Sequence, residues 1–500
     1  MKFTNRKIEI LYEFLSRMSR EAYKDQLLIS NTIFSKQESN AHILEAYVAG
    51  EVPPKVTYLQ ITKKLVFYFV KNILGLILFV VTAIFHWFSG LKFEIDKKDE
   101  LILLDIYFVE KQILGKEGFE DIYFPGLSKY LKKTEKTYAF IPRWFGSKQP
   151  LKLLRVFRKL RKKQVPVLTP YQVLGLVDYL KALKFIMLYP FSIFRFMKTL
   201  GSSYEDKLLG FALWDVFDGQ VVENYIRFLF GQRLSFLVPG RIKCISWYEN
   251  VPAEKMFYLG LRTLPEKIEI IGAQLFVRPN TLMNLFPDAD EMPFKVIPDK
   301  ILVNGPSFRF NLDQVPVEVG PSLRYKYLFN SVDSKVGEFI LVVMPYWDHV
   351  TNHVLDVIRE VDWPVPVKIK FHPTMNCEKY KIKIPEKFSV TTEPLPSVLP
   401  GALMVVGHST GALVEAAALG IPVIDVQCPQ KFSHDYMPES GNGIIWGQAN
   451  NSKDVGLLVK NFQETLKENP EQLKEEGRKM RSFCFAEPTE ELIHRAFELD

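Results

Sequence analysis

A short polar turn in the last quarter of the chain has the composition of an anion-binding site. Its residues are Gly407, His408, Ser409, Thr410 and Gly411. The turn follows an apolar run at 402–406, typical of a buried strand, and precedes a helix-forming run at 412–419. Unpaired backbone N–H groups at a helix start, together with the helix dipole, favour a phosphate. The alternative is an ordinary strand-to-helix turn in which Ser409 is the N-cap.

His372 is the second residue with the position of a phosphate ligand. It follows a strand-like run at 367–371 and precedes Pro373, which favours extended backbone at His372 and aims its side chain past the strand end. A histidine placed there can donate a hydrogen bond to a phosphate, and Lys370 would add positive charge. A surface histidine without a ligand is the alternative. The turn at 407–411 also follows a strand, so we expect both groups at the same edge of one sheet.

Apolar runs that alternate with helical stretches position these residues and indicate an α/β fold with two doubly wound, Rossmann-like domains. The first series of expected strands comprises 101–108, 137–141, 165–168, 242–247, 268–276 and 301–303. The second comprises 339–344, 367–371, 389–391, 402–406, 423–426 and 443–446. Ligands of open parallel sheets lie beyond the carboxyl ends of the strands, so two such domains predict a site in a cleft between them.

The chain divides into four expected regions. These are a helical, hydrophobic, membrane-associating region at 1–98, a first Rossmann-like domain at 99–330, a second at 338–485 and a C-terminal helix at 486–500. The first domain carries a basic and aromatic helical insert at 150–200.

The N-terminal region contains the most hydrophobic segment of the chain, an uncharged stretch of twenty residues at 72–91. This length just spans a hydrocarbon core of about 30 Å, and Trp87 lies near one end, as an interfacial anchor would. A true span, an in-plane or re-entrant helix and a buried core helix are all compatible with this composition. A second apolar segment at 185–200 contains Pro190 and Arg195 and should not span.

Positive charge concentrates at 152–163, although the net charge of +7 is modest for 500 residues. Seven Lys and Arg residues alternate there with apolar ones, so this helix could lie on an anionic membrane or contact nucleic acid, with a solvated helix face as the alternative. The neighbouring apolar segments favour a membrane surface, and no nucleic acid partner is expected. Four cysteines without a CxxC pair, and an N-terminus unlike a signal peptide, fit the cytoplasm.

The strand end at His372-Pro373, followed by the Ser409-Thr410 turn, resembles the HP and S-S/T motifs of bacterial sialyltransferases, polysialyltransferases and Kdo transferases. Those enzymes have a GT-B fold and use a CMP-linked donor. The resemblance implies that His372, Ser409 and Thr410 contact the cytidine phosphate. Glu415 resembles the glutamate that GT-B enzymes often direct at a ribose, with a solvated helix glutamate as the alternative.

The expected donor site includes three more residues by position: Lys370, His408 and Gly411. No metal or other cofactor is expected, because the histidine, the hydroxyls and the amides would neutralise the leaving phosphate. Two metal-like patterns are discounted. Asp288 and Asp290 lie in a polar loop rather than after a strand, and His349 and His353 lack the glutamate of an HExxH motif.

Five segments before residue 330 carry a wider resemblance. They are ISWYEN at 245–250, GLR at 260–262, IGAQ at 271–274, PDKILVNG at 298–305 and GPSLRY at 320–325. These segments are similar to the surface-carbohydrate-biosynthesis family of membrane-associated glycosyltransferases. The similarity covers roughly residues 205–450.

The catalytic carboxylate has two candidates. Glu249 follows an apolar strand, where it would accept the proton of an acceptor hydroxyl or stabilise an oxocarbenium-like donor. Asp218 precedes Gly219, and the related sialyltransferases carry two acids before such a glycine. This chain has Phe217 in the other position, so Glu249 and Asp218 stay equal alternatives, and a structural role for either is also open.

The resemblance implies a membrane-peripheral or single-span glycosyltransferase at the cytoplasmic face of the inner membrane. It would transfer a nonulosonate or Kdo-type sugar from a CMP donor to a bacterial surface glycan or a lipid-linked acceptor. Two alternatives are a polyol-phosphate transferase that uses CDP-glycerol and a non-catalytic scaffold of a glycan-assembly complex. The missing second acid before Gly219 motivates the scaffold alternative.

Overall fold

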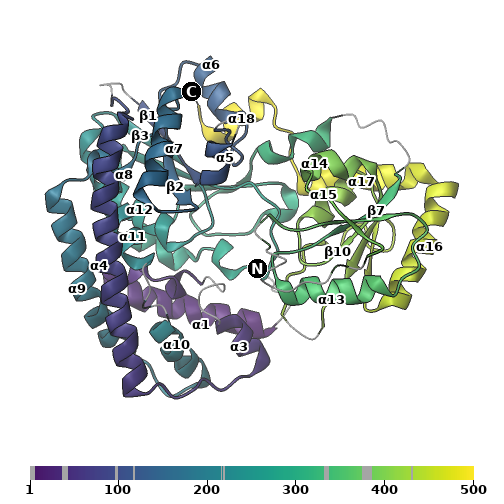
Figure 1. The fold of residues 1–500 in the computed structure, drawn as a ribbon, viewed down its shortest axis with the longest axis horizontal. Helices are drawn as coiled ribbons and strands as arrows, with labels where there is room; N and C mark the ends of the chain where they lie inside the picture. Colours follow the sequence, from purple (N-terminus) through teal and green to yellow (C-terminus); the bar gives the residue numbers. More distant parts are fainter. Residues whose placement is uncertain are drawn as a thin grey trace.

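The computed structural model of the chain describes residues 6–36, 43–95, 100–115, 119–215, 217, 220–330, 337–373, 375, 384, 386–429 and 432–499. Within these ranges the strands form two six-stranded sheets whose strand pairs are parallel. Figure 1 shows the two sheets and their helices side by side, the second in green and yellow. Helical crossovers cover parallel sheets, which explains the nearly continuous apolar strands. The predicted fold class, α/β with two doubly wound, Rossmann-like domains, is confirmed.

The first sheet has the strand order β2-β1-β3-β4-β5-β6. Its strands are β1 (Glu100–Val109), β2 (Tyr138–Phe145), β3 (Arg241–Trp247), β4 (Ile268–Gln274), β5 (Lys300–Val303) and β6 (Val317–Val319). The strand expected at 165–168 is wrong: Val167 forms only an isolated bridge with Phe140. The strand order reverses between β1 and β3, and open α/β sheets bind ligands at such a switch point.

The second sheet has the order β12-β11-β10-β7-β8-β9. Its strands are β7 (Phe339–Val343), β8 (Val367–Lys370), β9 (Ser389–Val390), β10 (Ala402–Gly407), β11 (Val423–Val426) and β12 (Trp446–Ala449). Numbered within the domain, this is the 3-2-1-4-5-6 order of dinucleotide-binding sheets. Its switch point lies between β7 and β10.

Helices surround both sheets. Those of the first domain are α5 (Glu110–Leu114), α6 (Leu127–Lys133), α7 (Pro150–Lys162), α8 (Pro170–Val173), α9 (Leu176–Met197), α10 (Tyr204–Asp215), α11 (Gln220–Leu237) and α12 (Pro252–Leu261). Those of the second are α13 (Asp348–Arg359), α14 (Leu395–Val398), α15 (Ala412–Ala418), α16 (Ser452–Glu468) and α17 (Pro470–Cys484). Short 3-10 turns include η5 (Ala289–Phe294) and η7 (Leu323–Phe329).

The C-terminal helix α18 (Glu490–Phe497) returns to the first domain. The ring of Phe497 lies 6.3 Å from that of Phe124, and Lys300 forms an ion pair with Glu498. The chain therefore passes from the second domain back to the first before it ends.

The N-terminal residues belong to the packing of the first domain. They form α1 (Arg6–Tyr23), two 3-10 turns at Gln26–Ser30 and Ile33–Ser35, and α3 (Ile43–Ala49). Glu291 forms ion pairs with Lys36 and Lys255, and all three side chains are buried. Although burial opposes ionisation, the two lysines lower the pKa of Glu291 to about 2.

A long apolar helix, α4 (Tyr58–Ser89), follows a capping box at Thr57 and ends at Gly90, whose φ of 66° is left-handed. Among the described residues it is the one helix that is long and apolar enough to cross a membrane. It lies alongside α7 and α9 of the first domain (Figure 1).

Candidate functional site

The two predicted phosphate ligands lie at the carboxyl edge of the second sheet, on either side of β7. His372 follows β8 and Ser409 follows β10, and both strands pair with β7. Two strand spacings separate them, about 10 Å. The ring of Tyr346, which follows β7, meets that of His372 edge-on at 5.8 Å. Burial lowers the pKa of His372, so its imidazole is neutral at pH 7 and offers an N–H as a hydrogen-bond donor.

Ser409 is held in a strained conformation at the switch point. Its φ of 55° is left-handed, which costs a residue with a side chain roughly 1–2 kcal/mol. Its buried Oγ accepts a hydrogen bond of 3.0 Å from the N–H of His434 and retains its own proton to donate. Thr410 Oγ1 accepts from the N–H of Ala412 at 3.4 Å, at the start of α15.

His408 is buried and has both ring nitrogens in protein hydrogen bonds. Its Nδ1 lies 2.7 Å from Asp425 Oδ1, and its Nε2 lies 2.8 Å from Ser433 Oγ. Because a carboxylate only accepts, Nδ1 donates to Asp425, and Nε2 forms the hydrogen bond with the Ser433 hydroxyl. The histidine therefore fixes the 432–436 segment, which in turn supplies the N–H bound by Ser409. No sequence motif links these three residues.

Lys370 and Glu415 are also engaged with the protein. The ammonium group of Lys370 donates to the carbonyl oxygen of Glu393, and burial lowers its pKa. Glu415 Oε2 accepts a hydrogen bond of 2.5 Å from the Tyr327 hydroxyl. Burial raises the pKa of Glu415 to about 7, against the opposing effects of Tyr327 and Arg324. This carboxyl therefore changes its charge near neutral pH.

The carboxyl edges of the two sheets are in contact through their loops. Gly411 lies against Val277, which follows β4, so closely that a Cβ at position 411 would be 3.1 Å from the Val277 Cβ. Thr281 Oγ1 lies 2.6 Å from His434 Nδ1. The hydrogen bond from Tyr327 to Glu415 is a third contact. The strand ends of the two domains therefore meet, as the predicted arrangement requires.

Glu249 lies just after β3, where the sequence placed it. Its side chain is partly exposed. Oε1 accepts a hydrogen bond of 2.8 Å from Trp247 Nε1, and Oε2 lies 3.4 Å from the Tyr107 hydroxyl. The backbone N–H of Glu249 donates to Glu254 Oε2 at 3.0 Å. These contacts hold the carboxylate at the switch point of the first sheet.

A buried network of charges lies beneath Glu249. Asp105, in the middle of β1, pairs with Arg227 at 2.8 Å and with Arg143 at 3.5 Å. Arg143 also pairs with Glu254. Burial raises the pKa of Glu254 to about 7, although the Arg143 charge opposes this. This network was not predicted from the sequence, where its one signal is Asp105, a charged residue inside an otherwise apolar strand.

Arg324 is an exposed cation beside Trp247, the residue that donates a hydrogen bond to Glu249. Its guanidinium lies 5.2 Å from the centroid of the Trp247 ring and 5.9 Å from that of Tyr123. It opens η7, the segment that also carries Tyr327 toward Glu415. One short segment thus brings a cation to Trp247 and a hydroxyl to the second domain.

The rival carboxylate, Asp218, lies outside the described residues. Of the discounted metal pattern, Asp290 forms an ion pair with Arg20, and Asp288 caps η5. Among the described residues, the ligand atoms of His408, Asp425 and Asp435 lie within 4.8 Å of one another. His408 Nδ1 already donates to Asp425, so this group is a hydrogen-bonded cluster as it stands. The absence of a metal requirement stays a prediction.

Comparisons with known proteins give structural similarities only. No family model matches the chain, and no curated protein sequence matches it. A solved structure of MurG from Acinetobacter baumannii is 12% identical and matches 80% of this chain and 100% of its own, with a TM-score of 0.41. HepE from Anabaena, in complex with UDP-glucose, is 10% identical over 80% of this chain and 98% of its own, with a TM-score of 0.39. UDP-GlcNAc 2-epimerase from Neisseria meningitidis, bound to UDP-GlcNAc, is 12% identical. The match covers 80% of this chain and 98% of the epimerase chain, with a TM-score of 0.41.

Proposed function

We propose that this protein is a glycosyltransferase that transfers a sugar from a nucleotide-sugar donor, without a metal ion. The donor would be a CMP-linked nonulosonate or Kdo-type sugar. The acceptor would be a surface glycan or its lipid carrier at the cytoplasmic face of the bacterial inner membrane. The single observation that carries the proposal is the position of His372 and Ser409 on either side of β7, at the switch point of a sheet with dinucleotide-binding strand order.

The second domain would bind the donor phosphate. The neutral imidazole of His372 and the hydroxyls of Ser409 and Thr410 are hydrogen-bond donors at the ends of two strands that flank β7. When the bond between the anomeric carbon and the phosphate oxygen breaks, its electron pair stays on that oxygen, and these donors would stabilise the new charge. The strain stored at Ser409 supports a functional role, because left-handed serines persist where the surrounding structure requires them.

The first domain would supply the base and bind the sugar acid. Glu249 would take the proton of the acceptor hydroxyl as its oxygen bonds to the anomeric carbon. Its hydrogen bond from Trp247 fixes the carboxylate in place. The exposed guanidinium of Arg324, beside the same ring, would pair with the carboxylate that distinguishes an acidic sugar from a neutral one. Asp218 stays the rival base.

Binding of CMP, measured by calorimetry, tests the donor site. We expect His372→Ala and Ser409→Ala each to weaken CMP binding by about tenfold to a hundredfold, the value of one hydrogen bond to a charged group. His494→Ala on α18 and the exposed Ser482→Ala on α17 are matched controls and should bind CMP like the parent. Equal affinity in all five proteins would contradict the assignment.

A donor screen separates the proposed reaction from its alternatives. We expect release of CMP from a CMP-linked acidic sugar, with Arg324→Gln losing this activity. Release of CMP from CDP-glycerol would instead identify a polyol-phosphate transferase, and turnover of UDP-sugars would overturn the cytidine assignment. No turnover with any donor, alongside intact CMP binding, would favour the scaffold alternative.

A further inference from the structure

The helices α4 and α9 form a broad apolar face on the outside of the first domain. They run antiparallel: the rings of Tyr68 and Tyr189 stack at 5.7 Å, and those of Phe79 and Tyr179 lie 6.0 Å apart. Both helices follow one edge of the molecule in Figure 1. The exposed large side chains of this face include Phe67, Leu74 and Ile77 on α4 and Leu180, Met187 and Phe191 on α9. Exposed apolar faces of this extent mark interaction surfaces.

From Asn72 onward, α4 carries more polar residues on its packed side than on its exposed side. The side that packs on the protein carries Asn72, Thr82 and His86, all buried. His86 Nε2 lies 3.1 Å from Thr169 Oγ1, and burial lowers the pKa of His86 to about 4. Between residues 73 and 88 the exposed side chains of α4 are all apolar or aromatic. A surface helix in water turns its apolar stripe inward, so this exposed face is suited to an apolar solvent.

Packing against the protein decides between a span and an in-plane helix. Tyr68 donates to the carbonyl of Ile186 at 3.1 Å, and Arg161 donates to the carbonyl of Ser89 at 3.2 Å. These two anchoring points on α4 are 21 residues apart by number, roughly 32 Å along a helix. A hydrocarbon core is about 30 Å thick, so a span would draw the attached domain into it.

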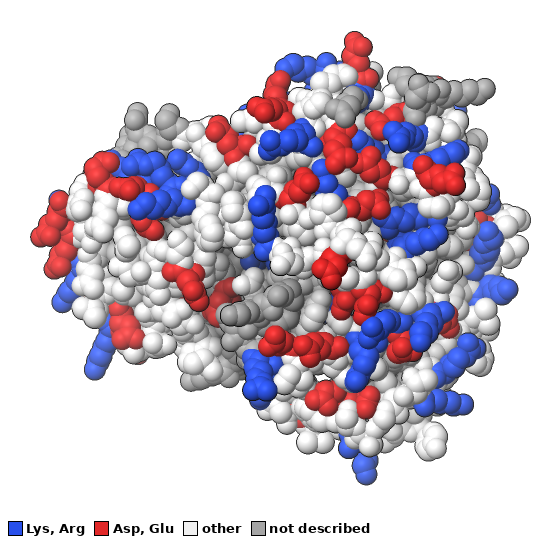
Figure 2. Space-filling model, turned by 180° about the vertical axis from the view of Figure 1, so that it is seen from behind, with Lys and Arg blue, Asp and Glu red and all other residues white. Residues whose placement is uncertain are grey.

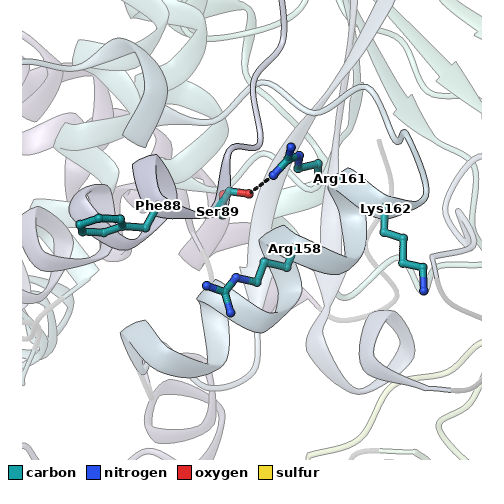
Figure 3. Close-up of a pocket in the computed structure, with 5 residues that line it drawn as sticks. All are labelled: Phe88, Ser89, Arg158, Arg161 and Lys162. Atoms are coloured by element: carbon teal, nitrogen blue, oxygen red, sulfur yellow. Dashed lines mark hydrogen bonds between the residues drawn. The ribbon is translucent and has the colours of Figure 1, made fainter.

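A basic pocket lies where the apolar face ends. It has a volume of about 480 Å³ and is lined by Phe88, Ser89, Arg158, Arg161 and Lys162. On the face opposite to that of Figure 1, acidic and basic side chains are interspersed (Figure 2). In contrast, the pocket is lined by basic side chains from α7 and by the exposed Phe88 at the end of α4 (Figure 3). None of the residues that line it is acidic.

We propose that α4 and α9 lie in the plane of a bilayer, with their exposed faces among the upper acyl chains, and that the pocket binds the phosphate of an anionic phospholipid headgroup. Apolar helix faces enter the headgroup boundary by about 5–10 Å, which leaves basic side chains at the rim level with the phosphates. The inference deepens the proposed function and rests on it for the lipid-linked acceptor. The membrane contact itself is independent of sugar transfer.

Sedimentation with vesicles tests this contact without donor or acceptor. We expect the full chain to bind vesicles of phosphatidylcholine with phosphatidylglycerol more tightly than vesicles of phosphatidylcholine alone. Replacement of Arg158, Arg161 and Lys162 by Gln should weaken binding to the anionic vesicles on the order of a hundredfold and abolish the preference. Loss of the Arg161 bond to Ser89 could prevent folding of the triple variant. In that case the double variant Arg158→Gln, Lys162→Gln, which keeps this bond, should still bind anionic vesicles more than tenfold more weakly than the parent.

Matched controls distinguish binding through this one surface from binding through the net positive charge of the whole protein. Replacement of Lys453, Lys460 and Lys467 on α16 by Gln removes the same charge from an exposed helix of the second domain and should leave binding unchanged. Ile77→Gln with Leu78→Gln should weaken binding to both vesicle types, whereas Ile444→Gln with Leu457→Gln should not. A wild-type protein that stays soluble with both vesicle types, or an equal loss in the α16 variant, would overturn the proposal.

The depth of α4 distinguishes the in-plane helix from a span. Environment-sensitive labels at Val66→Cys, Leu74→Cys and Ile84→Cys cover 18 residues, roughly 27 Å of helix. Quenching by lipids brominated at different acyl positions should report similar depths for all three labels. Depths that increase steadily along the helix would show a span instead. Vesicle binding with no sugar transfer would leave this inference standing and reject the proposed reaction.

Discussion

The carboxyl edges of the two sheets handle charge in opposite ways. At the first, Asp105, Arg143, Arg227 and Glu254 neutralise one another in a buried network. At the second, His372 and Ser409 offer neutral hydrogen-bond donors, and Ser409 is held in place by a backbone N–H rather than by an ion. Paired charges fix a geometry, whereas neutral hydrogen-bond donors can bind an anion. In the proposed function, the first edge would position a reactive group and the second would bind a ligand.

Glu249→Gln should have the largest effect on activity, because it removes the proposed base at the first edge. The amide keeps the hydrogen bond from Trp247 but cannot accept a proton, so kcat should fall by about 10²–10⁴ with the KM for donor unchanged. Steady-state kinetics with the exposed Glu266→Gln as the control measure this. Full activity in Glu249→Gln, with loss in Asp218→Asn, would assign the base to Asp218.

Arg143→Met tests whether the first edge is a structural network. It leaves the buried carboxylates of Asp105 and Glu254 without their shared partner, so the free energy of unfolding should fall by about 3–5 kcal/mol. The exposed Arg241→Met, at the start of β3, should change it by less than about 0.5 kcal/mol. Urea unfolding measures both, and equal stabilities would remove the contrast between the two edges.

Asp425→Asn tests whether the second edge is also positioned, through His408. The variant loses the carboxylate that holds Nδ1, so the segment that binds Ser409 should loosen and CMP affinity should fall by about 1–3 kcal/mol. Ser433→Ala should act in the same direction with a smaller effect. Calorimetry with Asp356→Asn, an exposed aspartate of α13, provides the control. Unchanged CMP affinity in Asp425→Asn would limit His408 to a role in folding.

The smallest expected effect is a pH-dependent change in the free energy of unfolding, which arises from Glu415 at the second edge. Burial raises its pKa from 4.5 to about 7, so the folded state binds more protons than the unfolded state between these values. Its contribution to stability is therefore lost as the pH rises from 4.5 to 7 and is constant above that. Glu415→Gln should gain stability relative to the parent over this range. Parallel pH profiles in urea unfolding would contradict the shift.

Much of the fold could be predicted from the sequence because buried parallel strands are apolar along their length. The strand at 165–168 failed because an apolar run of four residues at a sheet edge makes only the Val167 bridge. The short strand β6, with Glu318 at its centre, has too little apolar character to be predicted.

The candidate site could be predicted only in part. The placement of His372 and Ser409 at one sheet edge could be predicted because each lies just past the end of a strand, and the ends of parallel strands share an edge. The partners of His408 were missed because Asp425 and Ser433 come from different segments and meet only in the folded domain. Hydropathy identified α4 but not which of its faces is exposed, since that depends on the packing against α9.

The return of α18 to the first domain has a mechanical consequence. The chain joins the domains once between η7 and β7 and again between α17 and α18, where Gly305 lies against the backbone of Cys484 and Phe485. Two covalent connections define a line, and rotation about that line is the one rigid-body movement that stretches neither of them. Opening and closing of the domains about this line would follow a fixed arc, along which the carboxyl edges of the two sheets meet in the same register.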